Sequence, residues 1–537
     1  MPNDYRSILK IPYKLVVLVV LDGFGVAQRY QPNSTWNYAK RPTMEYMERY
    51  WPFTTLQASG VAVGLSWGEP GNSEVGHLTM GAGRVVFTHL PRIIVAIQDE
   101  TFFTNQAFLD ASAHVKENNS SLHLMGLFSS GSVHAYAEHL YALLEFAKRE
   151  NIERVFLHLF TDGRDAPMQE AAKYYAHFFE RIAQEYPFAK IVSLIGREYS
   201  MDRDGHWDRI QKTFDLFVEG AGKAFTDISS YIKEEYKAGF TDEFISPGFL
   251  ADENGKAVGR MSDNDAVIFF NYREDSAREI TDAIISDGFE KFKRRKLNNL
   301  VFVTMTGYDL RFSAKVAFPP LDIVHPLARV VSDAGLTQFH VAETDKYAHV
   351  TYFFNGGREK PYPGEERTLV ASIKTDRYNE TPEMSASKVT EEVISALGKY
   401  DFILVNFANA DMVGHTGDFN ATVKAIETLD YSLGALIPKV LESGGVMIVT
   451  ADHGNAEEKI YTGTGIKRTK HTINPVPFFL VSNETKNFVE VDKNEIIKKY
   501  TKTEGMLPDV APTVLSLLGL AVPKEMTGIN LLPKLIK

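Results

Sequence analysis

Six residues of this sequence have metal-binding side chains and follow or precede short apolar segments. They are three aspartates and three histidines: Asp22, Asp411, Asp452, His415, His453 and His471. The four-residue spacing of Asp411 and His415 puts both side chains on one face of a helix. Carboxylates and imidazoles are ligands for manganese, magnesium and zinc. Taken singly, each residue also fits a helix cap, a turn or a hydrogen-bonded core histidine. Together they favour two divalent ions, an arrangement that stabilises the attacking and leaving oxygens of phosphoryl displacement.

A candidate nucleophile, Ser73, lies in the segment Pro-Gly-Asn-Ser-Glu-Val-Gly-His of residues 70–77. Gly71 and Gly76 flank it and allow a tight backbone and the close approach of a ligand. A serine hydroxyl needs a base or a metal to become a nucleophile at neutral pH. The alternative is that Ser73 caps a helix with Glu74 in its first turn. Both can hold, since a helix N-terminus also favours phosphate.

Arginines follow three further apolar segments, within residues 161–165, 196–204 and 271–273. His134 lies just beyond Ser-Ser-Gly at 129–131 and can join them. Arginine binds carboxylate and phosphate through two parallel hydrogen bonds. The clusters therefore indicate a small, doubly anionic substrate. The alternative is that the arginines pair with the acidic residues interleaved among them.

The apolar segments that precede these residues are predicted to be strands of a doubly wound α/β fold. Residues 15–21, 402–406 and 446–450 are apolar at nearly every position, which is typical of parallel strands buried on both faces. Residues 421–441 have apolar positions at helical spacing. Ligands of such folds bind beyond the carboxyl ends of the strands, so we expect the aspartates to share one site.

The chain is predicted to form two domains. Further strand-like segments in its middle are residues 122–128, 155–160, 191–196, 266–271 and 300–304. The pair Pro319-Pro320 indicates a linker between domains. We therefore expect one domain from residues 1–87 and 321–537, with a second α/β domain, residues 88–320, inserted into it.

Composition excludes several classes of function. The 537 residues carry 58 basic and 69 acidic side chains, a net charge of −11, which argues against nucleic-acid binding. The absence of cysteine excludes disulfides, thiolate metal sites and thiol nucleophiles. The N-terminus lacks the pattern of a signal peptide, and the longest apolar segment is too short to span a bilayer. We expect a cytoplasmic protein that acts on a small molecule without a membrane or nucleic-acid partner.

The chain resembles the cofactor-independent phosphoglycerate mutases of the alkaline phosphatase superfamily, nearly from end to end. The motifs that carry the resemblance are Leu-Asp-Gly-Phe-Gly at 21–25, residues 71–77 with Gly-Ala-Gly-Arg at 81–84, Asp-Gly-Arg-Asp at 162–165, Met-Asp-Arg-Asp at 201–204, Lys-Tyr-Ala-His-Val at 346–350, Asn-Phe-Ala-Asn-Ala-Asp at 406–411 and Thr-Ala-Asp-His-Gly-Asn at 450–455. The resemblance implies an alkaline-phosphatase-like sheet domain that binds metal and an inserted domain that grips substrate. It also implies the interconversion of 3-phosphoglycerate and 2-phosphoglycerate, in glycolysis and gluconeogenesis, by a monomer that closes between its domains and needs no 2,3-bisphosphoglycerate.

The same resemblance implies a role for each candidate residue. One manganese ion would be bound by Asp411, His415 and His471, and the other by Asp22, Ser73, Asp452 and His453. Ser73 would carry the phosphoryl group, Asp165 would be the general acid and base, and Lys346 would offset phosphoryl charge. The substrate would be bound by His134, Arg164, Asp165, Arg197, Arg203, Arg273 and Lys346.

One position departs from the family pattern. Relatives have Asn-Phe-Arg-Pro-Asp-Arg, with two arginines, where this chain has Asn-Tyr-Arg-Glu-Asp-Ser at 271–276. Ser276 thus replaces an arginine that binds substrate in relatives, and either Arg278 compensates or substrate affinity or specificity differs. This departure leaves open a metal-dependent phosphatase or another phosphomutase. A third hypothesis, a non-catalytic binding protein, conflicts with the complete set of candidate metal ligands.

Overall fold

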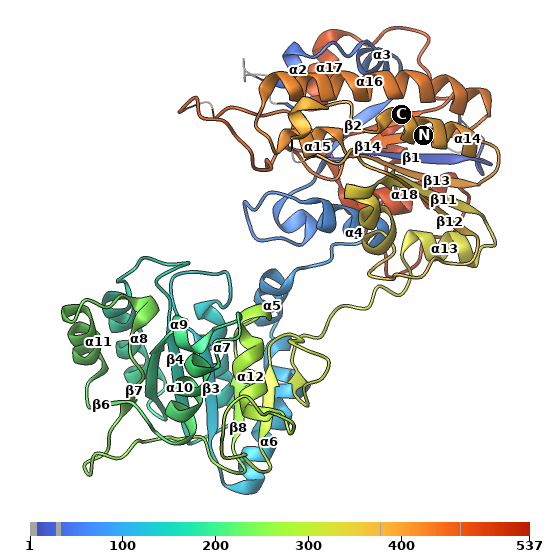
Figure 1. Ribbon diagram of the computed structural model, residues 1–537. Coiled ribbons are helices and arrows are strands. Elements are labelled where there is room, and N and C mark those ends of the chain that lie inside the picture. Colours follow the sequence, from blue (N-terminus) through green and yellow to red (C-terminus); the bar gives the residue numbers. More distant parts are fainter. Residues whose placement is uncertain (1–7, 28–33, 376, 462, 537) are drawn as a thin grey trace. The chain divides into compact units, whose positions relative to one another are not determined.

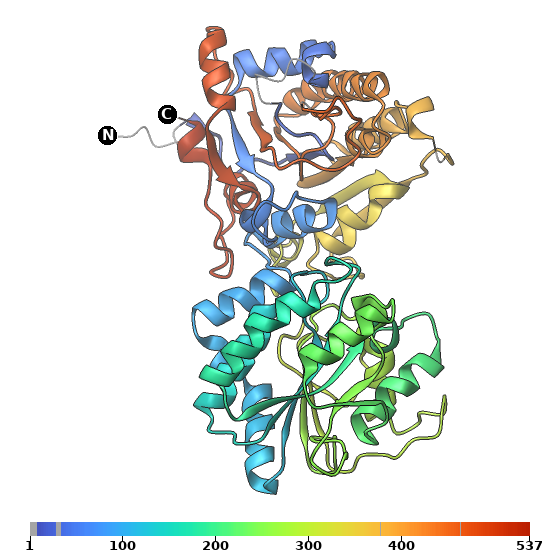
Figure 2. The same cartoon turned by 90° about the vertical axis from the view of Figure 1, so that its left-hand side faces the viewer.

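The computed structural model describes residues 8–27, 34–375, 377–461 and 463–536. The chain divides into two compact units. The first comprises residues 1–88 and 321–537, and the second comprises residues 89–320, coloured from blue through green to yellow in Figure 2. Each unit is built around one eight-stranded sheet in the described part of the chain. The predicted α/β class is confirmed.

The sheet of the first unit is mixed. Its strands, in spatial order, are β12 (Glu365–Val370), β11 (Gln338–Glu343), β13 (Phe402–Phe407), β1 (Val16–Leu21), β14 (Val446–Thr450), β15 (Val476–Val481), β2 (Phe53–Gln57) and β16 (Thr503–Met506). The first five run parallel, and β15 runs antiparallel to both of its neighbours. The sequence pattern indicated the parallel part but not this reversed strand.

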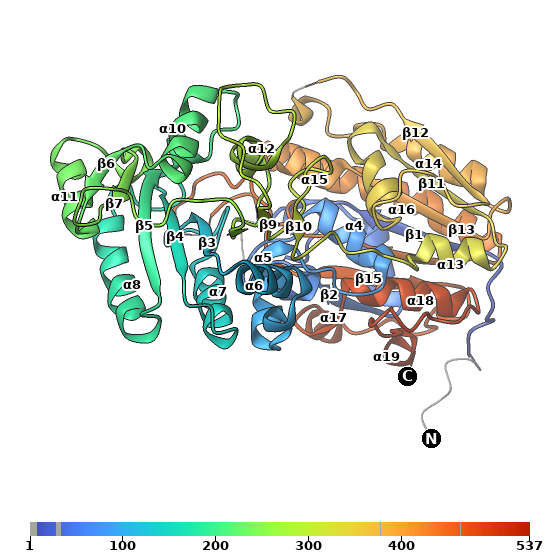
Figure 3. The same cartoon turned by 90° about the horizontal axis from the view of Figure 1, so that it is seen from below.

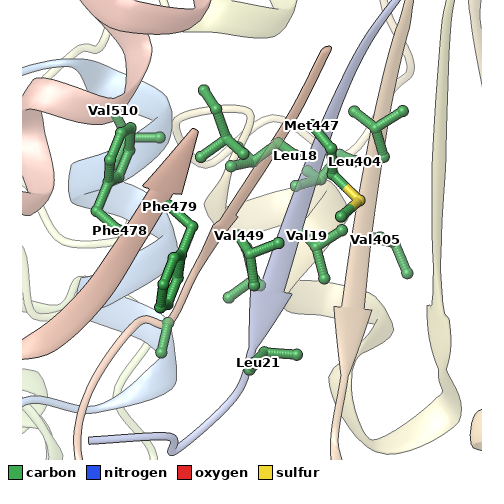
Figure 4. Packing of buried hydrophobic residues seen from close by; sticks show 14 of the residues in the cluster. Leu18, Val19, Leu21, Leu404, Val405, Met447, Val449, Phe478, Phe479 and Val510 are labelled. Atoms are coloured by element: carbon green, nitrogen blue, oxygen red, sulfur yellow. The ribbon is translucent and has the colours of Figure 1, made fainter. Parts of the chain in front are cut away.

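Strand β1 lies in the middle of this sheet because its sequence, Val-Val-Leu-Val-Val-Leu, suits burial on both faces. All six side chains are buried. Leu18 and Val19 pack with Leu404 of β13 and Met447 and Val449 of β14, as Figure 4 shows. The strands that precede Asp22, Asp411 and Asp452 are therefore held in register by one apolar core.

Helices cover both faces of the first sheet (Figure 1). One face carries the long helix α16 (Phe419–Glu442), which packs against α14 (Ala386–Ala396) and α3 (Pro42–Tyr50). The other carries α13 (Leu327–Asp333) and α18 (Val510–Leu517). Helix α16 covers the predicted range 421–441 and begins two residues earlier, because the Asp418 side chain accepts a hydrogen bond from the Ala421 N–H at 3.0 Å. The remaining α-helices of this unit are α2 (Thr35–Tyr38), α4 (Ser73–Ala82), α15 (Asn409–Gly414), α17 (Lys493–Tyr500) and α19 (Leu532–Leu535).

The second unit has the same layered plan. Its strands, in spatial order, are β10 (Lys315–Val316), β9 (Val301–Thr304), β8 (Ala266–Phe269), β3 (Leu122–Leu127), β4 (Val155–Thr161), β5 (Ala189–Gly196), β7 (Gly248–Leu250) and β6 (Lys223–Phe225). All neighbours pair in parallel except β5 with β7. Figure 3 shows α6 (Gln106–Asn118), α7 (Ala137–Arg149) and α8 (Ala171–Glu185) on one face, and α10 (Trp207–Val218) and α12 (Arg278–Ile285) on the other.

The other α-helices in the described part of this unit are α5 (His89–Gln98), α9 (Arg197–Ser200) and α11 (Ile228–Lys237). Among the described residues of the whole chain, no helix combines the length and the apolar character needed to cross a membrane.

Candidate active site

The carboxyl edge of the first sheet brings the candidate metal ligands together. Asp22 follows β1, Asp411 lies four residues after β13, and Asp452 lies two residues after β14. His471 precedes β15, and because this strand runs antiparallel to β14, its N-terminal end lies at the same edge. The antiparallel direction of β15 thus brings His471 to the edge where the parallel strands place the aspartates.

Asp411 and two histidines form the first group. Asp411 lies on α15, and His415 ends that helix one turn later, so that His415 Nε2 is 3.3 Å from Asp411 Oδ1. His471 Nε2 is also 3.3 Å from the same oxygen and 3.1 Å from His415 Nε2. Two imidazole nitrogens and a carboxylate oxygen therefore converge on one point, as metal ligands do.

Asp22, Asp452 and His453 form the second group. His453 Nε2 lies 3.6 Å from Asp22 Oδ1 and 3.7 Å from Asp452 Oδ2. It is also 3.8 Å from Asp411 Oδ1, and its ring stacks on His471 with the centroids 4.0 Å apart. His453 is therefore close enough to share a metal ion with the residues of either group.

These residues fit divalent cations. All the candidate ligand atoms are carboxylate oxygens or imidazole nitrogens, the donors that manganese, magnesium and zinc accept. Asp452 Oδ2 is buried and has no hydrogen-bond partner within the described part of the chain. Its polar neighbour, His77 Nδ1 at 3.2 Å, donates instead to the Ser73 carbonyl oxygen, and a bound cation would satisfy the Asp452 oxygen.

Ser73 lies between the two groups. Its hydroxyl donates a hydrogen bond to Asp22 Oδ1 at 3.0 Å and lies 3.0 Å from His453 Nε2. It is the first residue of α4, and Asn72, not Ser73, caps that helix by accepting from the Val75 N–H at 2.9 Å. The capping role considered from the sequence is therefore wrong, because the neighbouring amide takes it and leaves the serine side chain facing the aspartates.

Gly76 permits this placement of α4. A Cβ atom at this position would lie 2.6 Å from the carbonyl oxygen of Asp452, closer than any side chain allows. Only glycine lets the first turn of α4, with Ser73, approach the strand end that carries Asp452.

Lys346 is the buried cation of this cluster. Its Nζ donates hydrogen bonds to Ser73 Oγ at 2.7 Å, Asp22 Oδ1 at 2.7 Å and Asp411 Oδ2 at 2.6 Å. Burial alone would raise the pKa of Asp411, but the Lys346 ammonium and the neighbouring histidines, His453 first among them, together outweigh it and hold that pKa well below its usual range. Asp411 is therefore ionised, as a metal ligand must be.

The second unit collects most of the predicted substrate ligands around acidic residues. Arg197, which begins α9 directly after β5, donates to Asp162 Oδ1 at 2.7 Å and to Asp165 Oδ2 at 2.5 Å. Arg203 Nη1 lies 2.6 Å and Arg273 Nε 3.3 Å from the Asp275 carboxylate. The pairing of arginines with nearby carboxylates, the alternative considered from the sequence, therefore does occur.

His134 links these two clusters. Its Nε2 lies 3.8 Å from Asp165 Oδ2, and its Nδ1 lies 3.6 Å from Asp275 Oδ1. Burial lowers its pKa to about 4, and the neighbouring Arg197 acts in the same direction, so the imidazole is neutral. His134, Arg197, Arg203, Arg273 and Asp165 thus belong to one connected polar network.

Arg164 is placed differently. Its guanidinium contacts Glu198, at 2.9 Å, and Glu243, and its side chain is half exposed. Ser276 is buried, and the nearby Arg278 donates to the Tyr308 carbonyl oxygen at 2.8 Å. Arg278 thus bonds to the backbone of its own unit, and its side chain is half exposed.

Several residues of the site were not identified from the sequence. His77 Nδ1 lies 3.2 Å from Asp452 Oδ2, and Asn406 donates to Asp22 Oδ2 at 2.7 Å. Asn455 donates to Asp411 Oδ1 at 2.7 Å, and Asp275 holds two of the arginines. His77, Asn406 and Asn455 lie inside the motifs quoted above, but no spacing rule connects an amide to a carboxylate that a distant strand supplies.

Fold and side chains together define a class of α/β enzyme, in which carboxylates, imidazoles and a serine hydroxyl gather at the carboxyl edge of a sheet covered by helices. Comparison with known proteins identifies the group within this class. The family model described as BPG-independent PGAM N-terminus matches residues 93–310. A 2,3-bisphosphoglycerate-independent phosphoglycerate mutase of Clostridium beijerinckii is 46% identical over 522 residues, 97% of this chain and 99% of the relative. One of Chloroflexus aggregans is 45% identical, over 96% of this chain and 98% of the relative.

Among solved structures, the phosphoglycerate mutase of Leishmania mexicana, crystallised at low cobalt concentration, matches with a TM-score of 0.55 and 30% identity, covering 97% of this chain and 98% of that one. The chain belongs to the 2,3-bisphosphoglycerate-independent phosphoglycerate mutases, and it is an isomerase. The resemblance inferred from the motifs is thereby confirmed.

Proposed function

We propose that this mutase interconverts 3-phosphoglycerate and 2-phosphoglycerate, a reaction of glycolysis and gluconeogenesis, through a phosphoserine at Ser73. The environment of the Ser73 hydroxyl carries the proposal. Its oxygen lies 3.0 Å from both Asp22 Oδ1 and His453 Nε2 and 2.7 Å from Lys346 Nζ. No serine needs a buried lysine and ionised aspartates around it for packing alone, whereas a phosphoryl carrier needs charges that stabilise its oxygen.

Two manganese ions are proposed to complete the site. The ligands would be Asp411, His415 and His471 for one ion and Asp22, Ser73, Asp452 and His453 for the other. When bound, such ions lower the pKa of a coordinated hydroxyl and offset the charge of a transferring phosphoryl group. The reaction would need no 2,3-bisphosphoglycerate, since the serine itself carries the phosphoryl group between the two hydroxyls of glycerate.

Ser73, Asp165 and Lys346 are each proposed to have a separate role in the reaction. The ionised Ser73 Oγ forms a bond to phosphorus while the bond from phosphorus to the glycerate oxygen breaks, and the reverse step transfers the group to the other hydroxyl and releases the ionised Ser73 Oγ. Asp165 protonates the departing glycerate oxygen and later removes the proton from the hydroxyl that attacks. Lys346, with its ammonium 2.7 Å from Ser73 Oγ, stabilises negative charge on that oxygen and on the phosphoryl group.

The second unit is proposed to bind the substrate and the first to carry the metals and the nucleophile. His134, Arg164, Arg197, Arg203 and Arg273 supply hydrogen-bond donors to the carboxylate and hydroxyl groups of glycerate. All five already lie beside acidic partners: Asp165 or Asp275 for four of them, and Glu198 and Glu243 for Arg164. Binding can then exchange one carboxylate for another with little rearrangement.

Incubation of the purified protein with 3-phosphoglycerate and Mn²⁺ tests the proposal. We expect 2-phosphoglycerate as the product, with little free phosphate, and a phosphorylated peptide containing Ser73 after acid quenching. Free phosphate as the main product, or a phosphorylated residue other than Ser73, would refute it. The Ser73→Ala variant serves as the control for the labelled peptide.

A further inference from the structure

Two buried polar residues, Asn455 and Lys459, lie behind the Asp411 group and have no part in the reaction proposed above. Both side chains are fully buried. Lys459 Nζ donates hydrogen bonds to the Gly414 carbonyl oxygen at 2.9 Å and to Asn455 Oδ1. Burying an ammonium group costs several kcal/mol in desolvation, so Lys459 is not explained by a gain in folding stability alone.

Lys459 determines which way the Asn455 amide faces. An ammonium group has only donors, so the amide atom that meets it must be the carbonyl oxygen. The NH₂ of Asn455 is then left to face Asp411, and it donates to Asp411 Oδ1 at 2.7 Å and to the Asp411 carbonyl oxygen at 3.3 Å. Oδ1 is the same oxygen on which the His415 and His471 nitrogens converge.

Lys459 also holds the backbone that leads to His415. Gly414 is the last residue of α15, and His415 follows it. A Cβ atom at Gly414 would lie 3.0 Å from the Asn455 side chain, so this turn is packed directly on the amide. One buried cation therefore bonds both to the amide that orients Asp411 and to the peptide that precedes His415.

We propose that Asn455 and Lys459 are positioning residues for Asp411 and His415, and that the affinity of this ligand pair for a divalent ion depends on them. This inference rests on the proposed metal function of the site. Groups that orient metal ligands commonly change metal affinity by about 10–100-fold when they are removed. The effect is expected at the Asp411 group and not at the group of Asp22 and Asp452.

Calorimetric titration of the metal-free protein with Mn²⁺ tests the proposal. Wild type is compared with Asn455→Ala and Lys459→Met, which keeps most of the side-chain volume but removes the charge. We expect affinity at one class of site to fall by about 10–100-fold in both variants, with the other class unchanged. Equally, kcat should recover at saturating Mn²⁺, which a general loss of structure would not permit.

Asn355→Ala is the matched control. Asn355 is a buried amide of the same unit that donates to Glu365 at 2.9 and 3.1 Å and touches none of the candidate ligands. Its removal should lower the free energy of unfolding without changing Mn²⁺ affinity. The proposal is overturned if the Asn455 and Lys459 variants bind Mn²⁺ like wild type, or if Asn355→Ala weakens binding as much as they do.

Two further measurements separate the positioning role from misfolding of a variant and from failure of the proposed mutase function. If Lys459→Met does not fold, as judged by circular dichroism, Asn455→Ala and Asn455→Ser decide the question. Mutase activity is measured separately on wild type. Loss of the proposed function with intact Mn²⁺ binding would leave the affinity comparison valid, whereas wild type that binds no Mn²⁺ would refute the positioning role.

Discussion

Lys346 Nζ lies 2.7 Å from Ser73 Oγ, and the same ammonium bonds to Asp22 and Asp411. The lysine lies in a short helical turn, residues 344–346, that follows β11, whereas Ser73 begins α4. A buried cation on a hydroxyl oxygen favours the ionised form of that oxygen. Lys346 therefore stabilises negative charge on the oxygen that is proposed to be the nucleophile.

The Ser73→Ala variant is expected to lose mutase activity by roughly 10⁴-fold or more, because no other oxygen can carry the phosphoryl group. The measurement is the rate of 2-phosphoglycerate formation in a coupled assay. Ser387→Ala, on an exposed turn of α14, is the control and should match wild type. Retention of even a tenth of the activity by Ser73→Ala would contradict the phosphoserine route.

Replacing Lys346 by Met should reduce kcat strongly and destabilise the metal-free protein. Removal of the ammonium leaves Asp22 and Asp411 buried without their cation, a loss of about 3–5 kcal/mol for a broken buried pair. Urea unfolding of the metal-free protein measures this loss. Added Mn²⁺ should restore much of the stability but not kcat, because the cation at Ser73 Oγ is still missing. Full recovery of kcat would exclude a catalytic role for Lys346.

Mn²⁺ affinity should rise with pH between 7 and 9. Burial lowers the pKa of His453, but Asp452, Asp411 and Asp22 outweigh it and raise that pKa to about 9 in the metal-free protein. The protonated imidazole therefore stabilises the metal-free fold fully below about pH 6.5, and this contribution is lost as the pH rises through about 9.

A metal must displace this proton, so affinity should increase by about tenfold per pH unit in this window. Calorimetry in two buffers of different ionisation enthalpy counts the protons released. A binding constant that stays flat from pH 6.5 to 9 would show that His453 does not bind the ion.

Arg273→Ala should lower kcat/KM by about 10–100-fold, the loss expected for one hydrogen-bonded charge on an anionic substrate. Its effect should fall mainly on KM, since Arg273 is proposed to hold the glycerate rather than the reacting atoms. Arg311→Ala provides the matched control, because Arg311 also pairs with a nearby carboxylate, Asp309, at 2.7 Å, and is exposed. Equal effects of the two variants would argue against a substrate-binding role.

Acid should destabilise the second unit through buried histidines, and His139 provides the clearest case. Burial lowers its pKa to about 3, and neither ring nitrogen has a hydrogen-bond partner in the described part of the chain. The unfolded chain binds a proton below about pH 6.5 while the folded one does not, so stability falls as the pH drops from 6.5.

His139→Leu should remove about 2 kcal/mol of this loss at pH 5. Urea unfolding at pH 5 and 7, followed by the fluorescence of Trp207 in the same unit, measures the difference. His177→Leu, at an exposed position of α8, should leave the pH dependence unchanged. An unchanged pH dependence in His139→Leu would contradict the assignment.

Much of the fold could be predicted from local patterns of apolar residues in the sequence. Strand β14 coincides with the predicted range, and β1 and β13 differ from theirs by one residue at one end. An all-apolar strand has only one favourable environment, the middle of a covered sheet. The reversed direction of β15 was not predicted, because strand direction depends on which neighbour it pairs with and not on its own side chains.

The sequence by itself determined the residue types of the site and the family of the chain. Aspartates and histidines after apolar strands indicate metal-assisted phosphoryl chemistry because few other residues bind divalent ions, and motifs spread along the chain identify the mutases. Only the tertiary structure decided that Lys346 contacts Ser73, that Asn72 caps α4, and that His471 reaches Asp411. These contacts join residues up to several hundred positions apart, and the packing of strands and helices, which no local spacing records, sets the distances between them.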